Sequence, residues 1–163
     1  MIAIQTARFP EQLHVVRTIF REYAQSLGID LGFQQFDAEL AGLPGKFAAP
    51  RGCVLLASNH DGEIVGCVAM RPIKETICEM KRLYVRPAGR GLQVGRQLAT
   101  RICVAAKQAG YQRMRLDTLP TMRAALRLYL SLGFEPIDPY VFNPIPGAIF
   151  LECDLTRQRE QRA

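Results

Sequence analysis

Glycine and arginine residues are closely spaced between residues 89 and 96, where the sequence reads Gly-Arg-Gly-Leu-Gln-Val-Gly-Arg. Glycine lets the backbone turn sharply and approach a ligand without a Cβ atom in the way. If this run opens a helix, the first backbone N–H groups lack intrahelical partners, and the helix dipole favours an anion there. Arg90 and Arg96 add positive charge in a form that suits phosphate oxygens. The run therefore predicts a phosphate-binding turn, with a plain strand-to-helix turn carrying two solvated arginines as the alternative.

The spacing of this run disfavours two common nucleotide-binding loops. A P-loop ends in Gly-Lys-Ser or Gly-Lys-Thr, and no such ending occurs here. The dinucleotide fingerprint requires Gly-x-Gly-x-x-Gly. Here Gly89, Gly91 and Gly95 give Gly-x-Gly-x-x-x-Gly, with one residue too many between the second and third glycines.

A strand and a helix are expected on either side of the glycine run. Residues 76–85 are rich in β-branched, aromatic and aliphatic side chains and are followed by Arg86-Pro87, which is typical of the end of a strand. The helix is expected over residues 94–109, before Gly110, because apolar residues recur there at intervals of three and four. These residues are Val94, Leu98, Ile102, Ala105 and Ala109.

The strand at residues 76–85 changes its apolar face part of the way along. Cys78 and Met80 are apolar at one parity, whereas Leu83 and Val85 are apolar at the other. A strand of period two can do this only if an extra residue is inserted, so we expect a β-bulge near residues 81–82. The bulge would free backbone groups at residues 83–85 to pair with an amide-bearing ligand.

Two motifs in this order resemble those of the GNAT acetyltransferases. Residues 90–95, Arg-Gly-Leu-Gln-Val-Gly, are similar to the acyl-CoA pyrophosphate loop of that superfamily, and residues 81–87 are similar to its fourth strand. Residues 125–134, Ala-Leu-Arg-Leu-Tyr-Leu-Ser-Leu-Gly-Phe, resemble its second signature, Ala-x-x-x-Tyr-x-x-x-Gly-Phe. The resemblance covers residues 2–155 and is strongest over residues 79–134.

The resemblance implies an α/β fold with a mixed, mostly antiparallel sheet of about seven strands, helices on both faces and a bulged central strand. Residues 1–155 would form a single acetyltransferase-like domain, followed by a polar tail at residues 156–163. The implied activity is transfer of an acetyl group from acetyl-CoA to a primary amine by direct attack in a ternary complex. The residues implied to bind acetyl-CoA are Leu83, Tyr84, Val85, Arg90, Gly91, Leu92, Gln93, Val94, Gly95 and Arg96.

Acetyl transfer to an amine needs a base and an acid. An amine with a pKa near 10.4 must lose a proton, which costs about 4.6 kcal/mol at pH 7, and a carboxylate can accept it directly or through water. Glu79 is the candidate base, with a surface salt bridge to Lys81 as the competing interpretation. Tyr129 occupies the signature tyrosine position, so the resemblance implies that it protonates the departing thiolate. The structural alternative is a core tyrosine on a helix.

Residues that contact the acceptor are harder to predict. Tyr140 and Asn143, on a loop rich in proline and aromatic residues, are candidate acceptor contacts, and Glu22 ranks below them. A segment carrying Phe33, Phe36 and Phe47 either lines a substrate pocket or packs into the core. The identity of the acceptor stays open among small amines, amino acids, antibiotics, peptides and protein lysines.

Two departures from the family pattern support a second hypothesis. Gln93 replaces a glycine of the loop motif, and a glutamine is costly there if the residue needs positive φ. Met122 stands seven residues before the tyrosine, where an asparagine often binds the pantetheine arm. Both changes could weaken CoA binding. The alternative function is therefore a catalytically silent domain that senses acyl-CoA or binds a partner.

The remaining pattern predicts the other elements of the domain. Strands are expected at residues 2–6, 53–58, 63–71, 113–118, 134–137 and 148–155, and helices at residues 10–26, 34–43 and 121–132. The second and third strands in the chain would be joined by a hairpin turn containing Asp61-Gly62.

Composition restricts the class of protein further. The 163 residues are 48% hydrophobic and 22% charged, which is ordinary for one globular domain. No apolar run is long enough to span a membrane, and the first residues do not resemble a signal peptide, so a cytoplasmic protein is predicted. The five cysteines include no Cys-x-x-Cys pair and are expected to be reduced thiols, and the two histidines are expected at the surface. No metal site is predicted.

Basic residues are concentrated in one part of the chain. Residues 71–127 contain 13 Lys and Arg against 3 Asp and Glu, a net charge of +10, whereas the whole chain carries +6. A positive patch suits a nucleotide with several phosphates, and it also suits nucleic acid. We disfavour a nucleic-acid binder because no helix-turn-helix, zinc or RNP-like motif occurs. The oligomeric state is not readable from the sequence, although homodimers are common in families that this chain resembles.

Overall fold

The structure is a computed structural model, and it describes residues 1–32 and 35–157. Seven strands form one sheet in the order β1-β2-β3-β4-β5-β7-β6. Every neighbouring pair is antiparallel except β4 and β5, which are parallel. The strands are β1 (Ala3–Thr6), β2 (Cys53–Ser58), β3 (Ile64–Pro72), β4 (Ile77–Val85), β5 (Arg113–Thr118), β6 (Glu135–Pro136) and β7 (Ile149–Asp154). The prediction of a mixed, mostly antiparallel sheet of about seven strands is confirmed.

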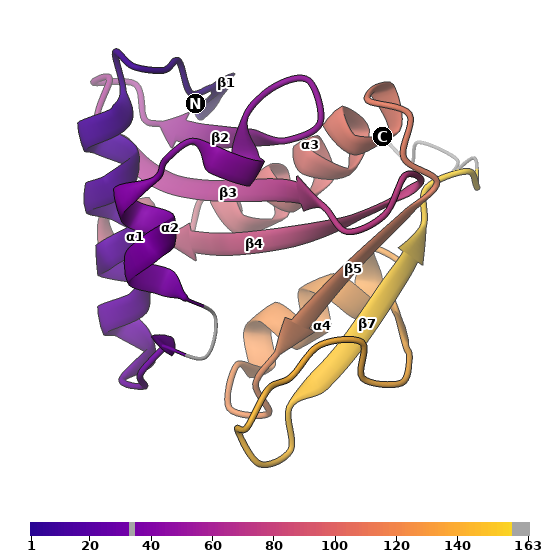
Figure 1. The fold of residues 1–163 in the computed structure, drawn as a ribbon. Coiled ribbons are helices and arrows are strands. Elements are labelled where there is room, and N and C mark those ends of the chain that lie inside the picture. The colour runs from indigo at the N-terminus through magenta and orange to yellow at the C-terminus, as the bar shows by residue number, and fades with distance from the viewer. Residues whose placement is uncertain (33–34, 158–163) are drawn as a thin grey trace.

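Helices cover both faces of this sheet (Figure 1). One face carries α1 and α2, and the other carries α3 and α4. Short 3-10 helices lie at Gly45–Phe47 and Pro87–Gly89. The α-helices are α1 (Leu13–Leu27), α2 (Phe36–Ala41), α3 (Val94–Gln108) and α4 (Arg123–Ser131).

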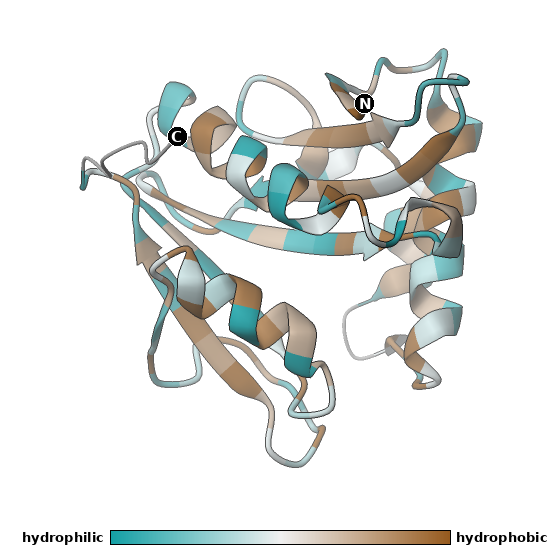
Figure 2. Cartoon of the chain, turned by 180° about the vertical axis from the view of Figure 1, so that it is seen from behind, coloured by the Kyte–Doolittle hydropathy of each residue, from teal (hydrophilic) through white to brown (hydrophobic). Residues whose placement is uncertain are grey.

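Alternate residues of the strands point into two separate cores. In β2, Leu55 and Ala57 belong to the core beneath α3, whereas Val54 and Leu56 belong to the core beneath α1. Such a sheet, buried on both faces, is expected to be apolar at both parities. Figure 2 shows that β2 and β3 are largely hydrophobic, whereas the middle of β4 and the outer turns of α3 carry hydrophilic residues.

A β-bulge interrupts β4 where the parity of the sequence changes. Cys67 of β3 pairs with Tyr84, but Ala69, two residues further on, pairs with Lys81. The β4 strand therefore carries one extra residue, and Arg82 adopts a φ of 62°, which is uncommon for a residue with a side chain. The predicted bulge at residues 81–82 is confirmed.

The sheet opens between β4 and β5. These strands pair only where residues 77–79 lie beside residues 113–115, at one end of both strands. Beyond Glu79 the strands diverge, and β5 and β7 lean away from the rest of the sheet (Figure 1). From the bulge to Val85, β4 pairs with β3 on one side but has no neighbouring strand on the other, so that side of its backbone faces an opening, as the sequence predicted.

The element boundaries differ from the predicted ones at several helix ends. The first helix begins at Leu13 because residues 9–12 form a turn, and the last begins at Arg123 rather than residue 121. Phe36 and Phe47 both lie in the core beneath α1, and Phe47 also lines a pocket described below. Phe33 lies outside the described residues.

Candidate functional site

An open groove of about 730 Å³ lies along the free end of β4 and the start of α4. Leu83, Tyr84 and Val85 line one side of it, and Arg90, Arg123 and Arg127 supply positive charge. The groove combines free backbone groups with three arginines. It therefore suits a long ligand that carries amides and phosphates. Sequence analysis missed Arg123 and Arg127, although their spacing of four places both on one side of α4.

The glycine run forms the turn that leads into α3, beside the groove-lining Arg90. Gly91 has a φ of 85°, and Gln93 has a φ of 56° immediately before the first helical residue, Val94. Gln93 therefore adopts the left-handed backbone conformation. This conformation costs a glutamine more free energy than it would cost the glycine that the family motif has at this position. The Arg96 guanidinium donates a hydrogen bond of 2.9 Å to the Ser131 hydroxyl.

The predicted cofactor residues therefore divide into two groups. Leu83, Tyr84, Val85 and Arg90 line the groove itself. Residues 91–96 form the turn and the first turn of α3, where the backbone N–H groups at the helix start lack intrahelical acceptors.

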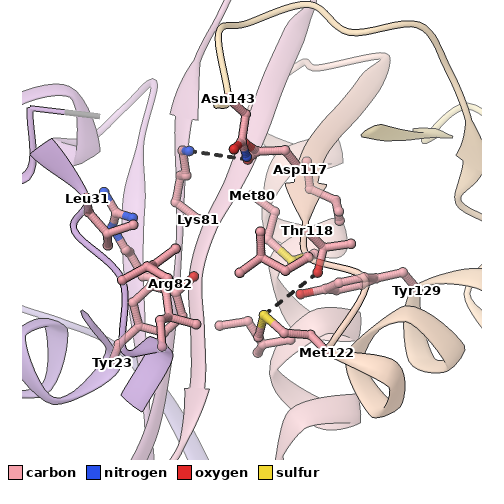
Figure 3. A pocket seen from close by; sticks show the side chains of 15 residues that line it. Tyr23, Leu31, Met80, Lys81, Arg82, Asp117, Thr118, Met122, Tyr129 and Asn143 are labelled. Atoms are coloured by element: carbon pink, nitrogen blue, oxygen red, sulfur yellow. Dashed lines mark hydrogen bonds and ion pairs between the residues drawn. The ribbon is translucent and has the colours of Figure 1, made fainter. Parts of the chain in front are cut away.

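A narrow cavity of about 40 Å³ continues from the groove into the opening between β4 and β5 (Figure 3). Its lining includes Met80 from β4, Thr118 from β5 and Tyr129 from α4. The groove and the cavity share five lining residues, which are Tyr23, Leu27, Leu83, Leu119 and Met122. A ligand lying in the groove can therefore extend its end into the cavity.

The hydroxyl of Tyr129 is available inside this cavity. Tyr129 is only 7% exposed, and its hydroxyl makes no hydrogen bond to the described residues. Every fully buried side-chain N or O atom of the described residues has a partner, so this hydroxyl keeps accessible surface. Burial raises the pKa of Tyr129 well above its ordinary value, and the nearby Tyr23 and Asp117 raise it further. The hydroxyl is therefore protonated at neutral pH and can donate a proton or a hydrogen bond.

A third pocket, of about 480 Å³, lies on the other side of the opening, between α2 and the loop that precedes β7. Glu39, Arg71 and Glu79 contribute charged groups to its lining, and Val141 and Phe142 contribute apolar surface. Lys81 and Asp117 line both this pocket and the narrow cavity. The groove, the cavity and the pocket are therefore neighbours in that order, and the Lys81–Asp117 ion pair lies between the last two.

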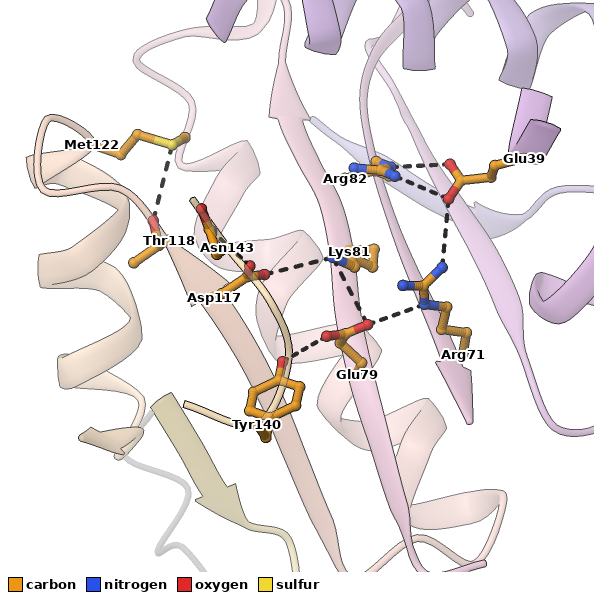
Figure 4. A network of polar contacts seen from close by, with 10 residues as sticks. All are labelled: Glu39, Arg71, Glu79, Lys81, Arg82, Asp117, Thr118, Met122, Tyr140 and Asn143. Carbon is orange, nitrogen blue, oxygen red and sulfur yellow. Dashed lines mark hydrogen bonds and ion pairs between the residues drawn. The ribbon is translucent and has the colours of Figure 1, made fainter. Parts of the chain in front are cut away.

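Glu79 lies at the centre of a polar network in the third pocket (Figure 4). Its carboxylate accepts hydrogen bonds of 2.6 Å from the Tyr140 hydroxyl and 3.0 Å from Arg71 Nε. Lys81 Nζ lies 3.8 Å from Glu79 Oε1, and both side chains are buried. The Glu79–Lys81 ion pair, which was the competing interpretation of Glu79, is therefore present, but it is internal rather than on the surface. The pKa of Tyr140 is raised by burial and by the Glu79 carboxylate, so Tyr140 remains a neutral donor.

Asp117 is the carboxylate that sequence analysis missed. Asn143 Nδ2 donates a hydrogen bond of 3.0 Å to Asp117 Oδ2, and Asn143 Oδ1 accepts one from the Ile145 N–H, which fixes the orientation of the amide. Lys81 Nζ lies 3.5 Å from Asp117 Oδ1. Period two in β5 could have indicated Asp117, because buried Leu116 and Thr118 flank it and point to the opposite face.

The two predicted catalytic residues do not line the same space. Tyr129 lines the narrow cavity and Glu79 lines the third pocket, with Lys81 and Asp117 between them. Tyr140 and Asn143, the predicted acceptor contacts, lie beside the acidic groups Glu79 and Asp117. Glu22 lies elsewhere: its carboxylate binds Arg86 with two hydrogen bonds, of 2.8 and 2.7 Å.

Much of the positive charge in residues 71–127 is neutralised by carboxylates from other parts of the chain. Glu39 binds Arg82 through hydrogen bonds of 2.9 and 3.0 Å and lies 3.6 Å from Arg71. Glu152 likewise binds Arg113 and Arg115. Arg90, Arg123 and Arg127, which line the groove, form no ion pair with the described residues, so their positive charge is not neutralised in this way.

The five cysteines are free thiols, and burial suppresses the reactivity of at least three. Burial raises the pKa of Cys53 from 9.0 to about 11 and that of Cys78 to about 12, and it also raises the pKa of Cys67. Only the thiolate reacts with alkylating agents, and the shift at Cys53 lowers its thiolate fraction at pH 8 by about 100-fold.

We therefore expect Cys53, Cys67 and Cys78 to react with iodoacetamide at pH 8 at least about 100-fold more slowly in the folded protein than in urea. The rate at Cys53 should rise as the pH approaches 11. Peptide mass spectrometry at timed intervals measures each site. Native rates within tenfold of the rates in urea would contradict this description of the thiols.

The described part of the chain contains neither a cluster of metal-binding side chains nor a membrane-spanning helix. Residues 1–32 and 35–157 contain no group of three or more His, Cys, Asp and Glu side chains placed to hold a metal ion. Within the same residues, no helix has the length and apolar character needed to cross a membrane.

Comparisons with known proteins place this geometry in context. The model of the acetyltransferase (GNAT) family matches residues 13–134. A protein of Schizosaccharomyces pombe, named as an uncharacterized N-acetyltransferase, is 41% identical over 157 residues, which cover 96% of this chain and 96% of that protein. A GNAT-family acetyltransferase from Staphylococcus aureus has a TM-score of 0.77 at 19% identity, over 95% of this chain and 99% of that one. PaiA N-acetyltransferase from Thermoplasma acidophilum, solved with coenzyme A, has a TM-score of 0.71 at 18% identity, over 94% and 99%.

Proposed function

The chain belongs to the GNAT family of acetyltransferases, and we propose that it transfers the acetyl group of acetyl-CoA to a primary amine by direct attack in a ternary complex. The observation that carries this proposal is the arrangement of groove, cavity and pocket, in which the cavity shares lining residues with both of the others. Two substrates can enter from opposite sides and meet at the opening between β4 and β5. No covalent enzyme intermediate is needed in such an arrangement.

The groove is the proposed site of acetyl-CoA. Arg90, Arg123 and Arg127 would bind its phosphates together with the start of α3, and the free backbone of Leu83–Val85 would pair with its amides. The acetyl thioester would then lie in the narrow cavity near Tyr129. The coenzyme A complex of the Thermoplasma protein, which has the same fold, supports this choice of ligand.

The third pocket is the proposed site of the amine. A protonated amine entering it meets the Glu79 and Asp117 carboxylates, either of which can accept its proton directly or through water. The neutral nitrogen attacks the thioester carbonyl carbon, a C–N bond forms, and the C–S bond breaks. As the amide forms, the nitrogen loses its second proton to solvent, from which Tyr129 later regains a proton. Tyr129, protonated and lacking a hydrogen-bond partner among the described residues, gives its proton to the departing sulfur.

Calorimetric titration with acetyl-CoA tests the donor site. We expect saturable binding in the wild-type protein. Reversing two groove charges, with Arg90→Glu and Arg127→Glu together, should weaken binding by tenfold or more, because hydrogen bonds to charged groups contribute about 1.5–3 kcal/mol each.

A matched control reverses two exposed charges on α3 outside the groove, Arg101→Glu and Lys107→Glu. This control should bind acetyl-CoA within about threefold of wild type, because exposed charges away from a ligand contribute little. Equal weakening in both double variants would show that binding depends only on overall charge. Absence of binding in the wild type would overturn the proposal in favour of a domain that binds a protein partner.

A further inference from the structure

Lys81 is a buried cation whose hydrogen-bonding capacity is not used by the described residues. Its side chain is 6% exposed, yet its ammonium group makes only two ion-pair contacts, at 3.8 Å to Glu79 and 3.5 Å to Asp117 (Figure 4). No hydrogen bond joins its three N–H groups to the described residues. Since every fully buried polar side-chain atom there has a partner, the Lys81 ammonium keeps accessible surface. A buried donor in this state is expected to bind an oxygen of a ligand.

Lys81 is also placed where the two substrates would meet. Of the described residues, Lys81 and Asp117 alone line both the narrow cavity and the third pocket. An acetyl group that moves from the cavity to an amine in the pocket therefore passes beside the Lys81 ammonium. The part of the acceptor within reach of Lys81 is the part next to its amine.

The charges around this point balance one another before any acceptor enters. Three cations, Arg71, Lys81 and Arg82, form ion pairs with three carboxylates, Glu39, Glu79 and Asp117. A simple ammonium ion would add an uncompensated positive charge to this network, and burying such a charge is costly. A zwitterion adds no net charge and satisfies groups of both signs.

We infer that the acceptor is an amino acid or a closely related zwitterion, with a carboxylate one or two carbons from the reacting amine. Lys81 donates to this carboxylate, while Asp117 and Glu79 face the ammonium. The pocket volume of about 480 Å³ is within the range that holds small ligands. This inference rests on the proposed acetyl transfer and names its substrate class.

The test compares each of the twenty common amino acids with the amine obtained by removing its α-carboxylate, where that amine is stable. Release of CoA from acetyl-CoA gives the rate, and mass spectrometry identifies the acetylated product. We expect at least one amino acid to have a kcat/KM tenfold or more above that of its matched amine. Lys81→Met should lower the ratio of kcat/KM for this amino acid to kcat/KM for its matched amine by about tenfold to hundredfold, because only the amino acid loses a contact to its carboxylate.

Lys107→Met, which removes an exposed lysine on the outer side of α3, is the control and should leave both rates unchanged. Equal loss for both acceptors in Lys81→Met, or wild-type activity that does not prefer the carboxylate, would overturn the inference. Acetylation confined to amines or peptides without this carboxylate would overturn it while leaving the proposed acetyl transfer intact. If Lys81→Met does not fold, the comparison of matched acceptors with the wild-type enzyme still decides whether the acceptor needs a carboxylate. Failure to bind acetyl-CoA would instead remove the proposed function itself.

Discussion

Tyr129→Phe is expected to lower kcat by about 10²- to 10⁴-fold, the usual contribution of a positioned general acid or base. Burial keeps the Tyr129 hydroxyl protonated, and that hydroxyl has no competing partner among the described residues, so it is free to protonate the leaving thiolate. Phenylalanine preserves the ring, including its packing on Phe134 at a centroid distance of 5.8 Å. Steady-state rates with a true acceptor measure the effect.

The loss should appear in kcat rather than in donor affinity, because the hydroxyl acts on charge that develops during the reaction. The Kd for acetyl-CoA should therefore stay within about threefold of wild type. Tyr111→Phe is a matched control, since the Tyr111 hydroxyl donates to the Arg51 carbonyl outside the three cavities. A Tyr129→Phe enzyme that retains more than half of the wild-type kcat would rule out the acid role.

Arg82→Met is expected to lower the free energy of unfolding by about 3 kcal/mol, the low end of the range for breaking a buried ion pair. The Arg82 side chain is 1% exposed and binds Glu39 through two hydrogen bonds, and its guanidinium lies over the Tyr23 and Phe36 rings. Without Arg82, the only ion pair that Glu39 keeps with the described residues is the one to Arg71, at 3.6 Å. Methionine is as strained as arginine at a φ of 62°, so the backbone adds little to the difference.

Urea denaturation of the folded protein measures this change. Arg113→Met is the control, because Arg113 is 51% exposed although it also binds a glutamate. That variant should lose less than about 1 kcal/mol, as is typical of exposed ion pairs. Equal losses in the two variants would mean that burial of the Arg82–Glu39 pair does not set its contribution to stability.

The family resemblance predicted the fold, whereas a local pattern of residues predicted its main irregularity. The change of parity between Met80 and Leu83 indicated the bulge, and the structure has it at that position. Helix ends were less predictable. The start of α1 was misplaced because Pro10 is compatible with both a turn and a first helical residue.

Pairings between distant residues were not predictable from local patterns. The acidic partners of Arg82 and Arg115, and one of the two partners of Arg71, come from α2 and β7, so charge counted along residues 71–127 overstated the positive surface. The motif identified Tyr129, whose helical position it specifies. It gave no information on Lys81 and Asp117, because they become neighbours only when β4 and β5 diverge.

Initial-rate kinetics with acetyl-CoA and an accepted amine test the central claim most directly, with both concentrations varied and the product identified by mass. We predict CoA release that depends on the amine, one N-acetylated product per CoA released, and intersecting double-reciprocal lines, as a ternary complex requires. Parallel lines would contradict direct attack. Tight binding of acetyl-CoA with no transfer to any amine would contradict the enzymatic role and would identify a domain that senses acyl-CoA.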